Sequence, residues 1–211
     1  MVITENDFVE LEFTGKISIT GEVFDTNIER DANAAGLKTT ELKPVVVAVG
    51  HGMLPEGLNS DLIGKEIGKI YDVQLKPHQA FGARKRELVK MVPTKHFHAQ
   101  QINPVRGMQL SLDGQLVKVL SSDRGRTLID FNNSLAGKKI QYTYTIKRKV
   151  DKIDEQINAV QDFLFRRTFP FEIKKDMIIF TIPKEAEQFV KFFSNKFQEI
   201  FKLRLETDIK E

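Results

Sequence analysis

The feature that most constrains this fold is a two-residue alternation of apolar and polar side chains. Residues 7–14 place apolar side chains at every second position with glutamates between them, and residues 140–146 show the same period most clearly. A period of two is that of a β-strand with one buried face. Shorter strands are expected at residues 45–49 and 71–75, and only residues 55–62 are typical of a helix.

Two connections complete the expectation for the first 150 residues. A turn at residues 20–22, around Gly21, is typical of a link between antiparallel strands. Residues 26–43 are polar and rich in Ala, Thr and Asn, which predicts a long loop. This part of the chain should therefore be mostly antiparallel sheet with one short helix.

The composition changes after Lys149, where ten of the 16 Phe residues of the chain follow. So many apolar rings must be buried, either within the tail or against a partner. Apolar residues recur every three to four positions over residues 153–164 and 189–200, which predicts two helices. Between these helices, residues 169–173 and 177–182 are typical of a hairpin, and a last strand is expected at residues 203–205. We expect a C-terminal α+β domain over residues 151–211.

Composition excludes several classes of protein. The chain of 211 residues has no Cys, so it can form no disulfide, thiolate metal site or cysteine nucleophile. Its N-terminus is acidic, and no apolar run approaches the roughly 18–20 residues of a membrane span, so a cytoplasmic protein is expected. The net charge of +3 is small, but residues 84–129 hold nine Lys and Arg against three Asp and Glu, which predicts an independent basic module.

Six short motifs follow one another between residues 13 and 138. They are Phe13-Thr14-Gly15, Val23-Phe24-Asp25, the run from Val49 to Leu58 with Gly50-His51-Gly52-Met53-Leu54-Pro55 inside it, the run from Leu62 to Gly68, Ala80-Phe81-Gly82 and Leu135-Ala136-Gly137-Lys138. In order and spacing they resemble the FKBP family of peptidyl-prolyl cis-trans isomerases. The stretch between residues 81 and 130 is similar to the insert-in-flap domain of SlyD-like and archaeal long-type members.

The resemblance implies an α+β fold with three parts. An FKBP antiparallel half-barrel sheet, wrapped on a short helix, would comprise residues 1–83 and 130–150. A small β-rich chaperone domain would be inserted at residues 84–129. The C-terminal domain at residues 151–211 matches the extra domain of archaeal long-type members in position and length only.

The resemblance also implies an apolar pocket between the sheet and the helix. The catalytic positions fall on Asp25, Phe81 and Tyr142, and the substrate-binding positions on Phe13, Phe24, Val45, Leu54, Pro55 and Leu58. Amide resonance opposes rotation by about 18–20 kcal/mol, and the twisted amide is less polar than the planar one. A dry aromatic pocket therefore favours the twisted form without a nucleophile, so no cofactor and no metal ion are expected.

Three positions depart from the family pattern. Phe81 and Phe13 stand where a Tyr is usual, and Pro55 stands where the backbone N–H of an Ile usually binds a ligand carbonyl. Each lost hydrogen bond would cost about 0.5–1.5 kcal/mol, which predicts a reduced isomerase activity. The alternative is a chaperone or holdase with an FKBP fold and little or no isomerase activity. A small-ligand or RNA-binding module is a third interpretation, supported by the basic insert alone.

The insert and the tail imply partners. Family members hold unfolded or nascent polypeptides with X-Pro bonds through the insert, and Met91 and Phe97 are the expected exposed contacts because Met adapts to varied partners. The basic side chains near Lys90 are interpreted as a solvated face, with ribosome association as the alternative. For residues 151–211 the Phe content favours a homodimer, and docking on another partner is the alternative.

Overall fold

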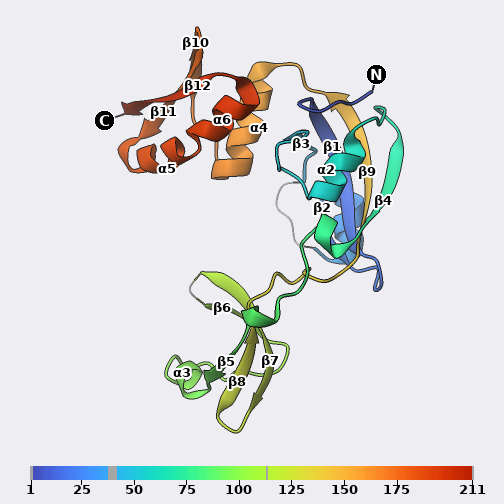
Figure 1. Ribbon diagram of the computed structural model, residues 1–211, viewed down its shortest axis with the longest axis vertical. Helices are drawn as coiled ribbons and strands as arrows, with labels where there is room; N and C mark the ends of the chain where they lie inside the picture. Colours follow the sequence, from blue (N-terminus) through green and yellow to red (C-terminus); the bar gives the residue numbers. More distant parts are fainter. Residues whose placement is uncertain (1, 38–41, 113, 211) are drawn as a thin grey trace. The chain divides into compact units, whose positions relative to one another are not determined.

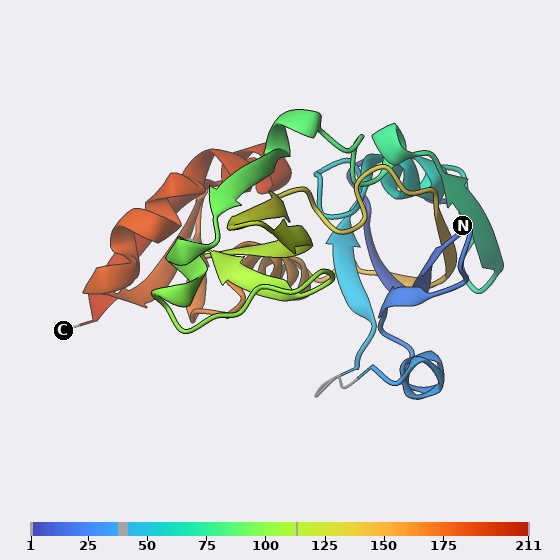
Figure 2. The ribbon, with the colours of Figure 1, turned by 90° about the horizontal axis from the view of Figure 1, so that it is seen from below.

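The computed structural model describes residues 2–37, 42–112 and 114–210, which form two compact units (Figures 1 and 2). The first unit combines Met1–Leu75 with Ile140–Glu211, and the second is Lys76–Lys139. In the figures the second unit is the green to olive part of the ribbon.

The first unit contains a five-stranded antiparallel sheet, which confirms the expected strands. Its members are β1 (Phe8–Ile17), β2 (Val23–Thr26), β3 (Val45–Ala48), β4 (Ile70–Leu75) and β9 (Ile140–Lys149). The order is β2-β1-β9-β4, and β3 also pairs with β1. The two segments with the clearest alternation, β1 and β9, pair along their length from Val9 opposite Lys149 to Ile17 opposite Ile140.

Two helices belong to this sheet. The expected short helix is confirmed as α2 (Glu56–Leu62), but the loop expected over residues 26–43 is wrong in part, since it contains α1 (Glu29–Ala35). Helix α1 buries only Ala32, so it leaves no apolar period in the sequence, and Gly36 ends it in the left-handed conformation with φ 66°. Residues 38–41 of that expected loop lie outside the described residues.

Helix α2 lies across the sheet between β3 and β4 (Figure 1). Its buried side chains are Leu58 and Leu62. The hydroxyl of Tyr144, on β9, donates a hydrogen bond of 2.7 Å to the carboxylate of Asp61 on the helix. This bond shows which face of the sheet α2 covers, namely the face that carries Tyr144 and, two residues earlier, Tyr142.

The tail forms a second, three-stranded sheet with helices. Its elements are α4 (Ile153–Phe165), β10 (Phe171–Lys174), β11 (Met177–Pro183), the 3-10 turn η3 (Lys184–Ala186), α5 (Glu187–Phe192), α6 (Ser194–Phe201) and β12 (Arg204–Lys210). The hairpin is confirmed, and β12 runs parallel to β11. The helix expected over residues 189–200 is broken at Phe193, whose ψ of 7° is not helical. The longest described helix, α4, has 13 residues, and no described helix is long and apolar enough to cross a membrane.

The aromatic rings of the tail are mostly buried. Phe165, Phe180 and Phe197 lie in one core, and Phe165 makes edge or stacked contacts with Phe169, Phe180, Phe189, Phe193 and Phe197. Three side chains of the first 150 residues, Phe8, Ala48 and Val150, belong to the same core. The tail therefore shares its core with the five-stranded sheet, while the expected division into three domains stays a prediction.

The second unit is an antiparallel sheet with short helices. It contains η1 (Pro77–Gln79), η2 (Arg86–Leu88), β5 (Val89–Pro93), α3 (Lys95–His98), β6 (Gln109–Leu112), β7 (Gln115–Asp123) and β8 (Arg126–Asp130), with the sheet order β5-β8-β7-β6. Its core is built on Phe97, Val117 and Ile129. The expectation that Phe97 is exposed is wrong, because the first turn of α3 points this ring into the core, where 3% of it is accessible. So small a unit needs every large ring for its own interior.

Candidate functional site

A row of four residues crosses the five-stranded sheet. Asp25 on β2 lies opposite Gly15 on β1, Gly15 opposite Tyr142 on β9, and Tyr142 opposite Val73 on β4. Residues opposite one another in adjacent strands share a face of the sheet. The row therefore brings two predicted catalytic residues, Asp25 and Tyr142, to the same face with only a glycine between them.

A β-bulge adds Phe24 to this face. The register shifts between Gly15 and Lys16, so that Gly15 pairs with Asp25 while Lys16 pairs with Val23. Phe24 is the extra residue, and a bulge of this kind turns two successive side chains toward one face. As a result both Phe24 and its neighbour Asp25 approach Tyr142. The sequence carries no signal for this bulge.

The ring of Tyr142 packs between two phenylalanines. Its centroid is 5.9 Å from that of Phe13 and 5.8 Å from that of Phe24, at interplanar angles of 66° and 82°. Such edge-to-face pairs align the positive edge of one ring with the negative face of the next. A Cβ atom at Gly15 would lie 2.6 Å from Cζ of Phe24 and 2.9 Å from Cε1 of Tyr142. The rings thus lie directly on the backbone of β1, and only glycine leaves them room.

Burial sets the electrostatics of this cluster. It raises the pKa of the Tyr142 hydroxyl far above its ordinary value, and the negative charge of Asp25 raises it further. Asp25 as a residue is exposed, but the protein atoms around its carboxyl raise its pKa by desolvation, an effect opposed by the N–H of Thr26. The site therefore holds a neutral phenol beside a carboxyl whose pKa is raised.

Asn27 fixes the strand that carries Phe13. Its side-chain oxygen accepts a hydrogen bond of 2.7 Å from the backbone N–H of Phe13, and its side-chain amide donates one of 2.8 Å to the carbonyl of Leu11. This clamp is buried. Asn27 was not predicted, since it falls in the expected loop, where a single buried amide leaves no pattern.

A chain of hydroxyls continues from Asn27 toward α1. Thr26 donates to the carbonyl of Phe13 at 3.0 Å, and its hydroxyl lies 2.9 Å from that of Thr14. Thr14 in turn donates to Asp31 at 2.6 Å, and this bond lowers the pKa of the Asp31 carboxyl. The end of β2 is therefore anchored immediately after Phe24 and Asp25, which holds both side chains against Tyr142.

Four further predicted binding residues lie on the face of the five-stranded sheet that carries Tyr142. They are Leu54, Pro55 and Leu58 at helix α2 and Val45 on β3. Leu58 is buried on α2, and Leu54 and Pro55 are half-buried just before it. Pro55 precedes the first residue of the helix with φ −52°, and its carbonyl accepts the N–H of Asn59 at 2.9 Å. Val45 begins β3, half-buried and paired with Leu11. Sheet and helix thus supply the two sides of the expected pocket.

The remaining predicted residues lie in the second unit. Phe81 follows η1 and is half-buried, and its catalytic role stays a prediction. Met91 is 60% exposed, as expected, and lines a surface cavity with Leu128 and Ser121. Arg124 and Arg126 also line this cavity. Of the two predicted client contacts, Met91 alone is therefore accessible.

Comparisons with known proteins match two parts of the chain to known families. Residues 2–98 match the family of FKBP-type peptidyl-prolyl cis-trans isomerases, and residues 90–135 match the family described as FKBP26, IF domain. A short-type peptidyl-prolyl cis-trans isomerase of Methanocaldococcus jannaschii is 29% identical over 148 residues, which are 69% of this chain and 93% of that protein.

Two bacterial relatives are named FKBP-type peptidyl-prolyl cis-trans isomerase SlyD. That of Haemophilus influenzae is 29% identical over 49% of this chain, and the aligned part spans 56% of its own length. That of Aeromonas hydrophila is 28% identical over 70% of this chain and 64% of its own length. These matches place the chain in an enzyme family, the FKBP-type peptidyl-prolyl cis-trans isomerases.

Proposed function

We propose that this chain accelerates rotation about X-Pro bonds of unfolded or nascent polypeptides, in the pocket between α2 and the ring cluster of Phe13, Phe24 and Tyr142. The observation that carries the proposal is the packing of Tyr142 between two phenylalanines, on the face of the sheet that also carries Asp25. The absence of Cys from the sequence supports a reducing compartment such as the cytoplasm.

The chemistry requires an environment rather than a nucleophile. A planar X-Pro amide is strongly polar and loses hydration when it enters an apolar ring cluster, whereas the twisted amide has lost its resonance and much of its polarity. The pocket therefore binds the twisted form better than the planar one, which is what lowers a barrier. Each reduction of about 1.4 kcal/mol in that barrier gives a tenfold gain in rate.

Two side chains supply polar contacts to this environment. The phenol of Tyr142 keeps its proton, so it can donate to a substrate carbonyl. The Asp25 carboxyl faces the same space, where its field acts on the dipole of the amide as it twists. The hydroxyl chain from Thr26 to Asp31 holds Asp25 on β2 during rotation. The rings of Phe13 and Phe24 hold Tyr142 on β9.

The test is an isomerisation assay on a proline tetrapeptide. Tyr142→Phe keeps the ring and removes the hydroxyl, and we expect catalytic efficiency to fall about fivefold to tenfold, as for one net hydrogen bond. Tyr71→Phe is the matched control, because the hydroxyl of Tyr71 accepts the N–H of Glu66 away from the cluster. A folded wild-type chain that does not accelerate isomerisation would refute the proposal and leave the holdase alternative.

The exposed surface of the insert favours a second activity, the holding of unfolded clients. Three large apolar side chains of this unit are accessible, namely Met91 at 60%, Leu116 at 64% and Val105 at 52% exposed. Deleting residues 86–127 and closing the gap with a short loop should abolish prevention of aggregation of a denatured client and leave tetrapeptide isomerisation nearly unchanged. Full prevention of aggregation by the deleted protein would exclude the insert as the client site.

The tail is proposed to pair two copies of the chain. Phe189 and Phe192 on α5 are 51% and 79% exposed, the two accessible rings in a tail that otherwise buries its aromatic side chains at least in part. Large exposed rings side by side are typical of contact surfaces. Docking on a different partner is the alternative, and ribosome association through the basic insert stays a prediction.

A further inference from the structure

The loop between β3 and α2, residues 49–55, carries two of the predicted binding residues, Leu54 and Pro55; we call it the rim loop. It is irregular, with φ angles of 92° at Gly50 and 73° at Gly52. The backbone N–H of Gly50 donates 2.8 Å to the side-chain oxygen of Asn59 on α2, which fixes the loop on the helix side. The first residues of the rim loop are therefore held by α2 and by the strand β3 that they follow.

The middle of the rim loop is restrained by the tail. Met53 accepts the N–H of Ala48 at its sulfur, 3.2 Å away, and packs against the core that the tail shares with the sheet. Met53 immediately precedes Leu54, so this contact limits where the binding residues can lie. An apolar contact alone leaves the loop free to slide, because dispersion forces have little direction.

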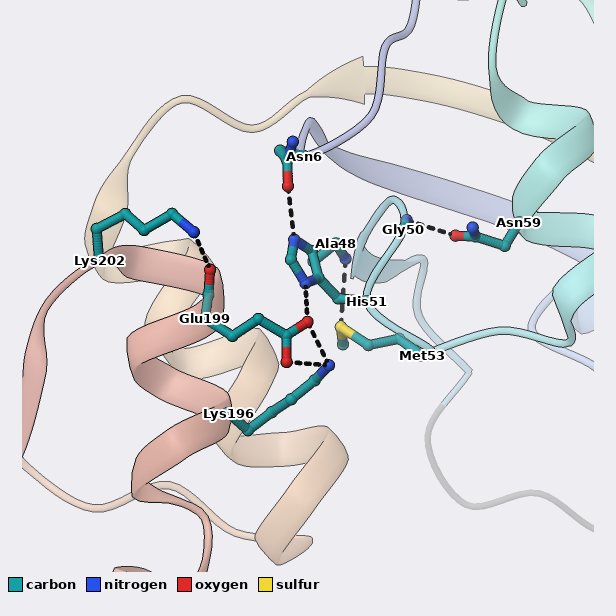
Figure 3. A network of polar contacts seen from close by, with 9 residues as sticks. All are labelled: Asn6, Ala48, Gly50, His51, Met53, Asn59, Lys196, Glu199 and Lys202. Atoms are coloured by element: carbon teal, nitrogen blue, oxygen red, sulfur yellow. Dashed lines mark hydrogen bonds and ion pairs between the residues drawn. The ribbon is translucent and has the colours of Figure 1, made fainter.

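His51 supplies the directional contact (Figure 3). Its ring is 8% exposed, with Nδ1 3.1 Å from the Glu199 carboxylate on α6 and Nε2 2.9 Å from the side-chain oxygen of Asn6. A carboxylate oxygen and an amide oxygen both only accept, so Nδ1 donates to Glu199 and Nε2 donates to Asn6, which places a hydrogen on each ring nitrogen. The imidazole thus bridges Asn6 in the N-terminal segment and Glu199 on α6, which lies 148 residues after His51.

Glu199 is itself held in place. Lys196 approaches both of its carboxylate oxygens, at 3.0 and 3.1 Å, and Lys202 donates to its backbone carbonyl at 2.9 Å. These bonds to Lys196, followed by the one to His51, lower the pKa of the Glu199 carboxyl. The carboxylate therefore stays ionised and fixed on the side of α6 that faces the rim loop.

We propose that His51 and Glu199 are positioning residues, through which helix α6 holds the rim loop so that Leu54 and Pro55 keep their place at the pocket. This inference rests on the proposed function. The tail then does more than shield apolar surface, since it sets the affinity of the pocket for the substrate. Because the pair touches neither Tyr142 nor Asp25, its loss should weaken substrate binding and leave the rotation step itself unchanged.

The test compares three variants of the full chain. Glu199→Ala removes the acceptor, and Glu199→Gln keeps an oxygen for the His51 N–H. Glu187→Ala is the matched control, because Glu187 is a half-buried glutamate in a 2.6 Å ion pair with Lys191 on α5. Each is measured by tetrapeptide isomerisation with KM and kcat separated, and by amide hydrogen exchange at Gly50 and His51.

We expect Glu199→Ala to raise KM about threefold to tenfold at constant kcat, as for one net hydrogen bond, and to speed exchange in the rim loop. Glu199→Gln should recover most of both values, and Glu187→Ala should change neither. Unchanged KM and exchange in Glu199→Ala, or equal changes in Glu187→Ala, would overturn the proposal. If the wild type shows no isomerisation, the proposed function fails, and the exchange data alone decide whether α6 holds the loop.

Discussion

Gly15→Ala is the sharpest perturbation of the ring cluster, because it adds one methyl group at a defined place. The new Cβ would lie 2.6 Å from Cζ of Phe24 and 2.9 Å from Cε1 of Tyr142. Carbon atoms in contact are normally about 3.5–4.0 Å apart, so each ring must move by roughly 1 Å. The φ of Gly15 is not in the left-handed region, so the substitution adds no backbone strain of its own.

The effect on activity should exceed the effect on stability. Inserting a methyl group into a packed site costs about 1–3 kcal/mol, and the half-buried Phe24 can relieve part of that by turning outward. A catalytic group displaced by about 1 Å can cost on the order of a hundredfold in rate. We expect Gly15→Ala to fold, to lose about 1–2 kcal/mol in the free energy of unfolding by urea titration, and to isomerise a proline tetrapeptide about 10-fold to 100-fold more slowly.

A double-mutant cycle with Phe24→Leu separates crowding from other causes. Leucine lacks the ring atom closest to the added methyl group, so Gly15→Ala should destabilise the Phe24→Leu protein less than the wild type, with a coupling of about 0.5–3 kcal/mol. Additive costs in the cycle, or a Gly15→Ala protein with wild-type stability and activity, would show that the rings do not press on the backbone of β1.

Three further predictions concern charge, client binding and assembly. Asp25→Asn should raise the free energy of unfolding at neutral pH and lower the isomerisation rate. The pKa of Asp25 is raised in the folded protein, so the wild type loses stability as Asp25 ionises. The gain should therefore vanish in urea titrations at acid pH, where Asp25 in the wild type and the asparagine in the variant are both neutral. A gain that persists at acid pH would contradict this assignment. Met91→Ser should weaken prevention of client aggregation without destabilising the insert, whereas Phe97→Ala should unfold it by losing about 3–5 kcal/mol, measured by thermal melting. Serine at both Phe189 and Phe192 should shift sedimentation toward the monomer, and a wild-type chain that is monomeric at high micromolar concentration would rule out dimerisation through the tail.

The sequence could predict those features that depend on one short segment, and it could not predict those that depend on two segments far apart in the chain. The strands were predictable because alternation is local. Gly15 and Asp25 could be named as candidates because they lie in short family motifs, and Tyr142 because it lies in the strand that follows the last motif. The bulge at Phe24 could not be predicted, since it is a property of two paired strands. Helix α1 was missed because it buries a single small side chain, Ala32, and therefore lacks an apolar period.

The errors in the insert and the tail have a similar cause. Phe97 was expected at the surface because the insert of the family binds unfolded chains through exposed apolar side chains. Its burial depends on strands that follow about 20 and 30 residues later, at Val117 and Ile129. The helical spacing of apolar residues continues without interruption from Phe189 to Ile200, so spacing alone predicts one helix, although the backbone breaks at Phe193 into α5 and α6. His51 and Glu199 are 148 residues apart, and no pattern within either segment indicates the other.

The pairing of β1 with β9 also has a consequence during synthesis on the ribosome. Val9 must wait for Lys149 before this ladder can close, and at about 5–20 residues per second that delay is roughly 7–28 s. The insert needs no such wait, because its strands pair within Val89–Asp130. We expect the nascent chain to carry a finished insert while β1 still lacks its central partner, and contacts of such long sequence separation make the final closure slow. In that interval the chain itself is an incompletely folded polypeptide, the kind of substrate proposed above for the finished protein.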